Sequence, residues 1–238
     1  MVGPPNQLGY CVVFSMLLAG TGGCASWSPE NSLLSGLRTT ARSQPSPDLG
    51  PAALSRSQSV ELSLKTAGEM ERAGHDRQAA ALYDQARTLD PNAADYARRL
   101  ARLYDRLNRD QDAQQEYRRA IEQAPGDADL LNDFGVFHLR RERWSAAEPW
   151  FRKSLDARPD HERAAVNLAL CVGMQGRITE SYQTFAGIVG AAAAHCNVGV
   201  LLARQGRTVE AREHFEQALA LDASLRPARE LLAQLDRS

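Results

Sequence analysis

Lysine is almost missing from this chain. Of its 28 basic residues only Lys65 and Lys153 are lysines, and the arginines are interspersed with 29 acidic residues for a net charge of −1. No segment concentrates positive charge, so the composition excludes a basic surface of the kind that binds nucleic acid or an anionic membrane.

Motifs of catalysis and metal binding are missing as well. The sequence has no glycine-rich phosphate loop, no Gly-x-Ser-x-Gly turn, and no His-Glu-x-x-His or Cys-x-x-Cys spacing. Cys171 and Cys196 stand apart and fit small buried side chains, and His195 and His138 fit packing positions in helices. We therefore expect no enzymatic activity, no cofactor and no metal site.

The N-terminal stretch has an apolar run that is too short to cross a bilayer. Nine residues, Cys11–Ala19, precede Gly20-Thr21-Gly22-Gly23-Cys24, a length that suits the core of a signal peptide better than a membrane span. Small residues before a cysteine resemble a bacterial lipoprotein signal, which implies that 1–23 is removed and Cys24 is lipidated. Ala25 then implies the outer membrane. Ordinary secretion and a cytoplasmic protein are the alternatives.

Residues 24–59 are rich in serine and proline and carry few patterned apolar residues. Such a composition cannot bury enough apolar surface to repay ordering, so it predicts a flexible tether. The spacing of Leu33, Leu34 and Leu37 leaves a second interpretation open, in which residues 32–38 form a short helix that docks on the rest of the chain.

What the chain does have is a 34-residue period. Pro91, Pro125 and Pro159 recur at this interval, as do four aromatic residues with a small residue four positions before each. The aromatic residues are Tyr83, Tyr117, Phe151 and Phe185, and the small residues are Ala79, Ala113, Ala147 and Ser181. Spacings of three and four place these side chains on one helical face, and a period of this length is typical of stacked repeats.

The pattern resembles the tetratricopeptide repeat (TPR), a helical hairpin of 34 positions. This resemblance implies an all-α fold, an α-solenoid of about five hairpins over residues 60–238, with repeats that begin near 60, 94, 128, 162 and 192 and a capping helix at 225–236. The predicted helices are Val60–Ala73, Asp76–Leu89, Ala94–Leu107, Asp110–Gln123, Ala128–Arg141, Trp144–Ala157, Glu162–Met174, Thr179–Val189, Ala192–Gln205, Thr208–Leu221 and Pro227–Leu235.

Three details of this pattern carry predictions of their own. Phe185 and Phe215 are only 30 residues apart, so four residues are missing between Ile188 and His195 and the second helix of repeat four should lack one turn. Thr66 stands where a large apolar residue is expected, which marks repeat one as a terminal cap. Gly74, Asn108, Gly176 and Gly206 are predicted to end helices in the left-handed conformation.

In the TPR fold the first helix of each repeat lines a concave groove. The resemblance therefore implies a groove that passes from charged to apolar and takes a peptide or an amphipathic helix, with the arginines of repeat two choosing an acidic flank. The alternative is that the tether or the last helix covers it. The groove residues are Arg98, Arg102, Arg106, Asn132, Val136, Leu139, Arg140, Val166, Leu170, Met174, Val200 and Arg204.

A lysine and asparagine clamp for peptide C-termini is not supported by the sequence. Asn167 and Asn197 hold the usual asparagine position, but repeat three has Asp133 there and the groove lacks lysine. The expected function is a scaffold that binds proteins, held to the cell envelope by its lipid. Short lipoproteins of this design resemble pilus-assembly and pilotin proteins of tight-adherence and type IV pili. Alternatives are a scaffold that recruits wall hydrolases and a cytoplasmic interaction module.

Overall fold

The computed structural model describes residues 55–91 and 96–237 of the chain. Helices connected by turns make up these residues, and no strand occurs among them. The helices are α2 (Arg56–Arg72), α3 (Asp76–Leu89), α4 (Tyr96–Arg106), α5 (Asp110–Gln123), α6 (Ala128–Leu139), α7 (Trp144–Ala157), α8 (Glu162–Met174), α9 (Ile178–Val189), α10 (Ala191–Arg204), α11 (Thr208–Leu221) and α12 (Arg226–Leu235).

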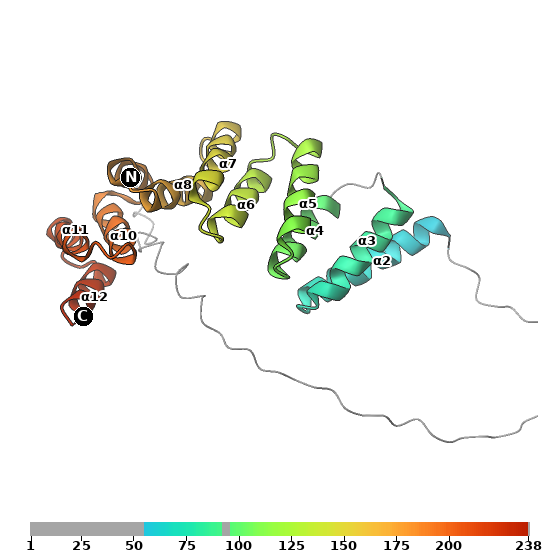
Figure 1. The fold of residues 1–238 in the computed structure, drawn as a ribbon, viewed down its shortest axis with the longest axis horizontal. Coiled ribbons are helices and arrows are strands. Elements are labelled where there is room, and N and C mark those ends of the chain that lie inside the picture. The colour runs from blue at the N-terminus through green and yellow to red at the C-terminus, as the bar shows by residue number, and fades with distance from the viewer. Residues whose placement is uncertain (1–54, 92–95, 238) are drawn as a thin grey trace, which may run out of the picture.

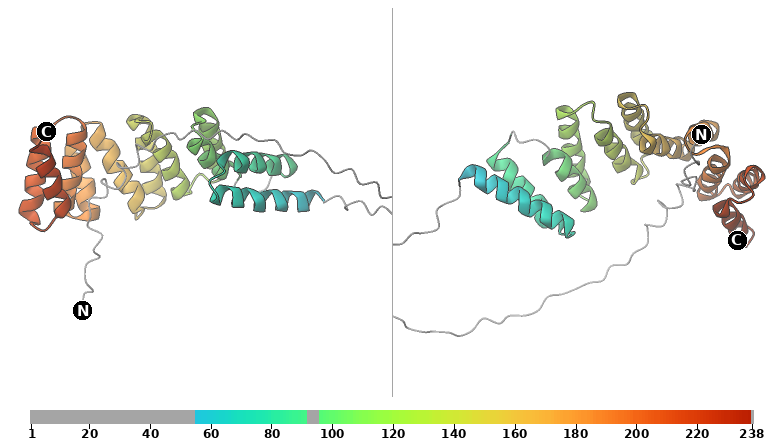
Figure 2. Two further views of the ribbon diagram at one scale, coloured as in Figure 1. Left: turned by 90° about the horizontal axis from the view of Figure 1, so that it is seen from below. Right: turned by 180° about the vertical axis from the view of Figure 1, so that it is seen from behind.

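Consecutive helices pair into five antiparallel hairpins, which follow one another along an arc from α2 at one end to α12 at the other (Figure 1). The further views in Figure 2 show the same succession. Helices α6 and α10 lie on the inner side of the arc relative to their partners α7 and α11 (Figure 1). The predicted all-α solenoid with a terminal helix is confirmed.

The periodic small and aromatic residues explain why the hairpins form. The aromatic rings at the repeated position of the five second helices are at most 2 % exposed, and small residues of the first helices admit them. These rings belong to Tyr83, Tyr117, Phe151, Phe185 and Phe215. A Cβ added at Gly135 would lie 2.5 Å from the Phe151 ring, and one added at Gly199 would lie 2.6 Å from the Phe215 ring. Interlocking of this kind leaves no void, which is how protein cores reach crystal-like packing density.

The turns inside the hairpins confirm the sequence prediction and add one residue to it. Gly74, Asn108, Gly176 and Gly206 all have positive φ, between 56° and 84°. Glu142 takes the same turn position in repeat three with φ of 56°. A left-handed glutamate is sterically unfavourable, and the pattern of glycine and asparagine gave no reason to expect it.

The four missing residues of repeat four come from two places. Helix α9 has 12 residues where the other second helices have 14. A single residue, Gly190, connects it to α10, whereas residues 158–161 connect α7 to α8. The prediction of one full lost turn was therefore wrong. The helix loses two residues, about half a turn, and the connection loses three, while α10 begins one residue earlier than the corresponding start of α8. The short connection is possible because Gly190 adopts φ of 82°.

The two ends of the array are capped by different structural features. Helix α2 begins at Arg56, four residues before the predicted start, because Ser55 and Gln58 form a capping box. It has Ser63 and Thr66 where the next repeat has Ala97 and Leu100; Ser63 is buried like Ala97, whereas Thr66 is only half-buried where Leu100 is fully buried, and this weaker apolar packing suits a terminal repeat. At the other end α12 packs its leucines against the apolar cluster of repeats four and five.

None of the helices in the described ranges is long and apolar enough to cross a membrane. The predicted signal peptide, Cys24, Ala25 and all but the last residues of the predicted tether lie outside those ranges, so these expectations stay predictions.

Candidate partner-binding face

The predicted groove residues lie on the first helices of repeats two to five. Arg98, Arg102 and Arg106 come from α4, Asn132, Val136 and Leu139 from α6, Val166, Leu170 and Met174 from α8, and Val200 and Arg204 from α10, while Arg140 caps α6. The hairpins follow one another along the arc (Figure 2). Residues at corresponding positions of the first helices therefore recur along one side of the array across four repeats.

Two groove arginines are held by acids of the preceding repeat. Arg106 donates to both carboxylate oxygens of Asp76, at 2.8 and 2.9 Å, and to Glu71 at 3.3 Å. Arg140 donates to Asp105 at 3.1 Å. Charge-assisted bonds of this kind join one repeat to the next. Arg106, one of the repeat-two arginines that were predicted to select an acidic partner, therefore already has acidic partners within the array, as does Arg140 of repeat three.

Arg98 and Arg102 differ in this respect. Arg98 donates to Asp127 at 2.7 Å and lies 3.8 Å from Asp133. Arg102 is exposed and makes no hydrogen bond or ion pair with any other described residue. Arg102 is therefore the arginine of repeat two that is best placed to bind an acidic side chain of a partner.

Asp133 is a half-buried acid beside these arginines. Burial raises the pKa of its carboxyl group, and the charges of Arg102, Arg98 and Arg163 oppose that rise. The neighbouring Asn132 is buried and accepts a hydrogen bond from Asn167 at 2.9 Å. Asn132 therefore acts in the contact between α6 and α8, and it presents little surface to a partner.

The apolar groove residues fall into two groups. Val166, Leu170 and Val200 are 5–8 % exposed and belong to the core cluster of repeats four and five. Val136, Leu139 and Met174 are half-buried and pack at the edges of the clusters. The second group offers a partner more contact area, because a fully buried side chain has none left to lose.

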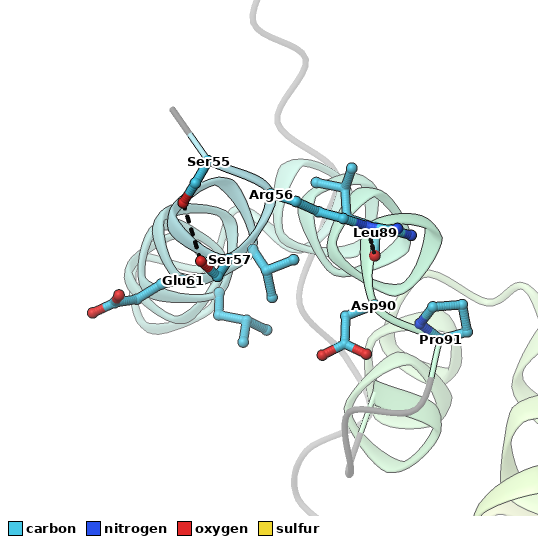
Figure 3. Close-up of a pocket in the computed structure, with 9 residues that line it drawn as sticks. Ser55, Arg56, Ser57, Glu61, Leu89, Asp90 and Pro91 are labelled. Atoms are coloured by element: carbon cyan, nitrogen blue, oxygen red, sulfur yellow. Dashed lines mark hydrogen bonds between the residues drawn. The ribbon is translucent and has the colours of Figure 1, made fainter. Parts of the chain in front are cut away.

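A cavity that the sequence did not predict lies at the start of the array. It measures about 930 Å³ and opens between the first turn of α2 and the end of α3 (Figure 3). Val60, Leu64 and Leu89 give it apolar walls, and the Arg56 guanidinium donates to the Leu89 carbonyl across it. Such a cavity depends on how two helix ends splay, which a periodic pattern does not encode.

Comparison with known proteins shows which families have similar repeats. The family model of the middle TPR-like domain of cilia and flagella-associated protein 70 matches residues 97–197, and a tetratricopeptide repeat model matches residues 192–224. The chain is a TPR repeat protein. No curated protein sequence matches the chain in this comparison.

Solved TPR structures share the fold at low sequence identity. YrrB, described as a TPR protein with an unusual peptide-binding site, is 20 % identical with a TM-score of 0.56, over 76 % of this chain and 98 % of its own. A MamA protein is 15 % identical with a TM-score of 0.58, over 69 % and 92 %. PilF of Pseudomonas aeruginosa is 20 % identical with a TM-score of 0.53, over 76 % and 90 %.

The cysteines are the remaining side chains that could act as nucleophiles or metal ligands. Cys171 and Cys196 are both buried. The Cys171 thiol donates to the Trp144 carbonyl, and burial raises the pKa of this thiol to about 12, so it is not a nucleophile at neutral pH. Among the described residues no three histidine, cysteine or acidic side chains gather in a way that could hold a metal ion.

Proposed function

We propose that the chain is a non-enzymatic scaffold that binds proteins along the concave face of its TPR array. The observation that carries the proposal is the arc itself, in which the first helices of successive repeats line one face (Figures 1 and 2). Solenoids use such extended concave surfaces to hold partners. The peptide-binding site named in the description of YrrB agrees with this function.

The partner is proposed to be an amphipathic helix or an extended peptide. Val136, Leu139 and Met174 supply half-buried apolar contacts, and Arg102 supplies an exposed positive charge two repeats away from Met174. An apolar strip beside an arginine that pairs with no acid in the described part of the chain suits a segment with an apolar face and an acidic flank. Affinity would come from the apolar contacts and orientation from the charge.

We further propose that a lipid on Cys24 tethers the array to the cell envelope, at the outer membrane, and that the scaffold assists the assembly of a pilus or secretion complex. The lipoprotein-like N-terminal sequence supports the tether, and the shared fold with PilF of Pseudomonas aeruginosa is compatible with the assembly role. Recruitment of wall hydrolases and a cytoplasmic interaction module are the alternative functions.

Site-specific photocrosslinking in cells tests the concave face. A photoreactive amino acid at Val136 or Arg102 should give one shared protein adduct, because both positions are proposed to face the same partner. The matched control is Val209 on α11, which is 70 % exposed and lies in a second helix. The same adduct from Val209, or none from the two concave positions, would remove the proposal.

The identity of the adduct separates the candidate functions. A pilus or secretion subunit supports the assembly role, and a wall hydrolase supports recruitment. The tether is tested in the same cells by mass spectrometry of the N-terminus, since a diacylated Cys24 and an intact Met1 exclude each other. Cys24→Ser should release the chain and its adduct from the membrane fraction, and an adduct that stays there would argue against lipid anchoring.

A further inference from the structure

Three arginines, Arg106, Arg140 and Arg204, hold the same position near the ends of α4, α6 and α10, and only the first two are paired in the same way. Arg106 reaches Glu71 and Arg140 reaches Asp105, in each case an acid 35 residues earlier in the preceding repeat. The position that would serve Arg204 in this way is Gly173, which has no side chain. The acid that pairs with Arg204 therefore lies outside the neighbouring repeat.

Packing explains why repeat four has no acid there. A Cβ added at Gly173 would lie 2.5 Å from Leu201 Cδ1 and 2.7 Å from Ser181 Oγ, closer than real Cβ atoms approach. The close contact of α8 with α9 and α10 thus requires glycine. It also removes the carboxylate that pairs with the arginine of the next repeat elsewhere in the array.

Arg204 instead crosses repeat four to reach repeat three. Its Nη2 atom lies 2.6 Å from Oε1 of Glu142, which is 62 residues earlier in the chain. The guanidinium carbon is also 5.8 Å from the centroid of the Trp144 ring. In a solenoid each repeat normally contacts only its neighbours, so this pair is an exception that needs a cause.

The short connection between α9 and α10 provides a cause. Only Gly190 separates these two helices, whereas four residues separate α7 from α8, so the connection limits how far repeat five can lie from repeat four. Gln205, the next residue after Arg204, donates to the Gly173 carbonyl at 2.8 Å and so fixes the end of α10 against α8. From this anchored point the arginine side chain extends to the turn between α6 and α7.

Glu142 is the second unusual member of the pair. It occupies the turn position that is glycine in three repeats and asparagine in one, and it does so with φ of 56°. Among residues 55–91 and 96–237, Arg204 is the one cation that pairs with the Glu142 carboxylate. Residues held in a strained conformation cluster at functional elements such as switches, so the strain and the pairing point to the same role.

We infer that Glu142 and Arg204 form a clasp that closes repeat five onto repeat three and controls access to Leu139 and Met174. Both side chains of the pair are partly exposed, at 64 % and 35 %. Exposed ion pairs are weak and are screened by salt, so the clasp opens at little cost. Leu139 precedes Glu142 by three residues, and the Met174 Sδ atom lies 3.9 Å from Nε2 of Gln205, the residue after Arg204; both side chains pack against the apolar cluster of repeats four and five.

In the proposed function, on which this step rests, the clasp selects the partner's charge. A segment with an acidic side chain replaces Glu142 on Arg204, because Arg204 has no carboxylate in the neighbouring repeat to return to. A segment with a basic side chain at that place is instead repelled by the positive charge of Arg204. The partner class is therefore an amphipathic helix with an acidic residue beside its apolar face.

A distance measurement in the full chain tests the clasp without a partner. Genetically encoded spin labels are placed at the exposed positions Ser145 and Thr208, near the turn of repeat three and the start of α11. Glu142→Gln and Arg204→Gln should each shift the distance distribution to longer and broader values. The exchange Glu142→Arg with Arg204→Glu should restore the original distribution. Salt at 1 M, which shortens the screening length to about 3 Å, should lengthen the distance in the parent chain and in the exchanged pair but not in the two single variants.

The control is Glu210→Gln, which removes the carboxylate that pairs with Arg207 within repeat five and should leave the distance unchanged. An unchanged distance in Arg204→Gln would overturn the clasp, as would failure of the exchanged pair to restore it.

A second readout separates the clasp from the proposed function. A photoreactive residue at Met174 should capture the partner more strongly in Glu142→Gln than in the parent chain and more weakly in Arg204→Gln. Distances that respond as expected while no variant yields an adduct would leave the clasp standing and overturn the scaffold function. Equal capture in the two variants, with the distances responding, would overturn the charge selection.

Discussion

The Nδ1 atoms of His195 and His214 face each other at 3.1 Å between α10 and α11. The Tyr182 ring of α9 covers His195, with 4.4 Å between the ring centroids. Burial lowers the pKa of both imidazoles, and the charge of His195 also lowers the pKa of His214. Glu210 favours the charged form of His214 and Arg207 disfavours it. The hydrogen bond therefore requires that at least one ring stays neutral.

This pair should make the last repeat sensitive to acid. Because both pKa values are lower in the folded than in the unfolded chain, the unfolded chain binds more protons below about pH 6.5. Stability is therefore complete above that pH and is lost as the pH falls through the folded pKa values. We expect the unfolding temperature to fall between pH 7 and pH 5, by about 2–4 °C for each kcal/mol lost.

The control uses substitutions that differ in burial. His195→Gln with His214→Gln should flatten this part of the pH profile, whereas His75→Gln, at an exposed position before α3, should not. His138 is buried and its pKa is also lowered, chiefly by burial, so a residual slope should remain until His138 is replaced. A profile that is as steep in the double variant as in the parent would contradict this assignment.

Two helical glycines should respond in opposite directions to alanine. In Gly135→Ala the new methyl group would lie 2.5 Å from the Phe151 ring, so the free energy of unfolding should fall by about 1–3 kcal/mol. Gly187 in α9 has no atom within 4 Å of an added Cβ, and Gly187→Ala should raise the free energy of unfolding by about 0.5–1 kcal/mol. Urea denaturation followed by circular dichroism measures both. Equal effects would show that helix propensity, and not the close approach to Phe151, decides.

The same contact shows why so much of the fold could be predicted from the sequence. Gly135 and Phe151 belong to one repeat, so their complementarity recurs at a fixed interval and is visible as a period. The pairing of Arg204 with Glu142 joins two repeats that are not neighbours and depends on a close contact at Gly173. Such a pair leaves no periodic trace. The helices were therefore predictable, and the internal partners of the groove arginines were not.

A buried amide pair between repeats three and four gives a third prediction. Asn167 donates to Asn132 at 2.9 Å, and the two side chains are each 3 % exposed. Asn167→Leu leaves the Asn132 oxygen without this partner, and Asn132→Leu leaves the Asn167 amide without it. Each should lower the free energy of unfolding by about 1–3 kcal/mol.

The double variant decides between loss of the bond and loss of packing. With both groups apolar no polar atom of the pair is left unpaired, so the double variant should be more stable than the sum of the single effects predicts. The coupling energy from a double-mutant cycle in urea measures this difference. Simple additivity would mean that each asparagine contributes through contacts other than their shared hydrogen bond.

The left-handed turn positions allow strain to be separated from ion pairing. Glu142→Gly removes a left-handed glutamate that costs about 1–2 kcal/mol, and it also removes an exposed ion pair worth at most about 1 kcal/mol. The net change in the free energy of unfolding should be small and stabilising. Gly206→Glu introduces a glutamate at φ of 76° at the same turn position in repeat five. The free energy of unfolding of this variant should fall by about 1–2 kcal/mol, because the new glutamate adds the strain without an ion pair like that of Glu142 with Arg204. Urea denaturation measures both variants. A clear fall in the free energy of unfolding of Glu142→Gly would contradict this prediction. It would mean that the ion pair with Arg204 contributes more than an exposed pair usually does.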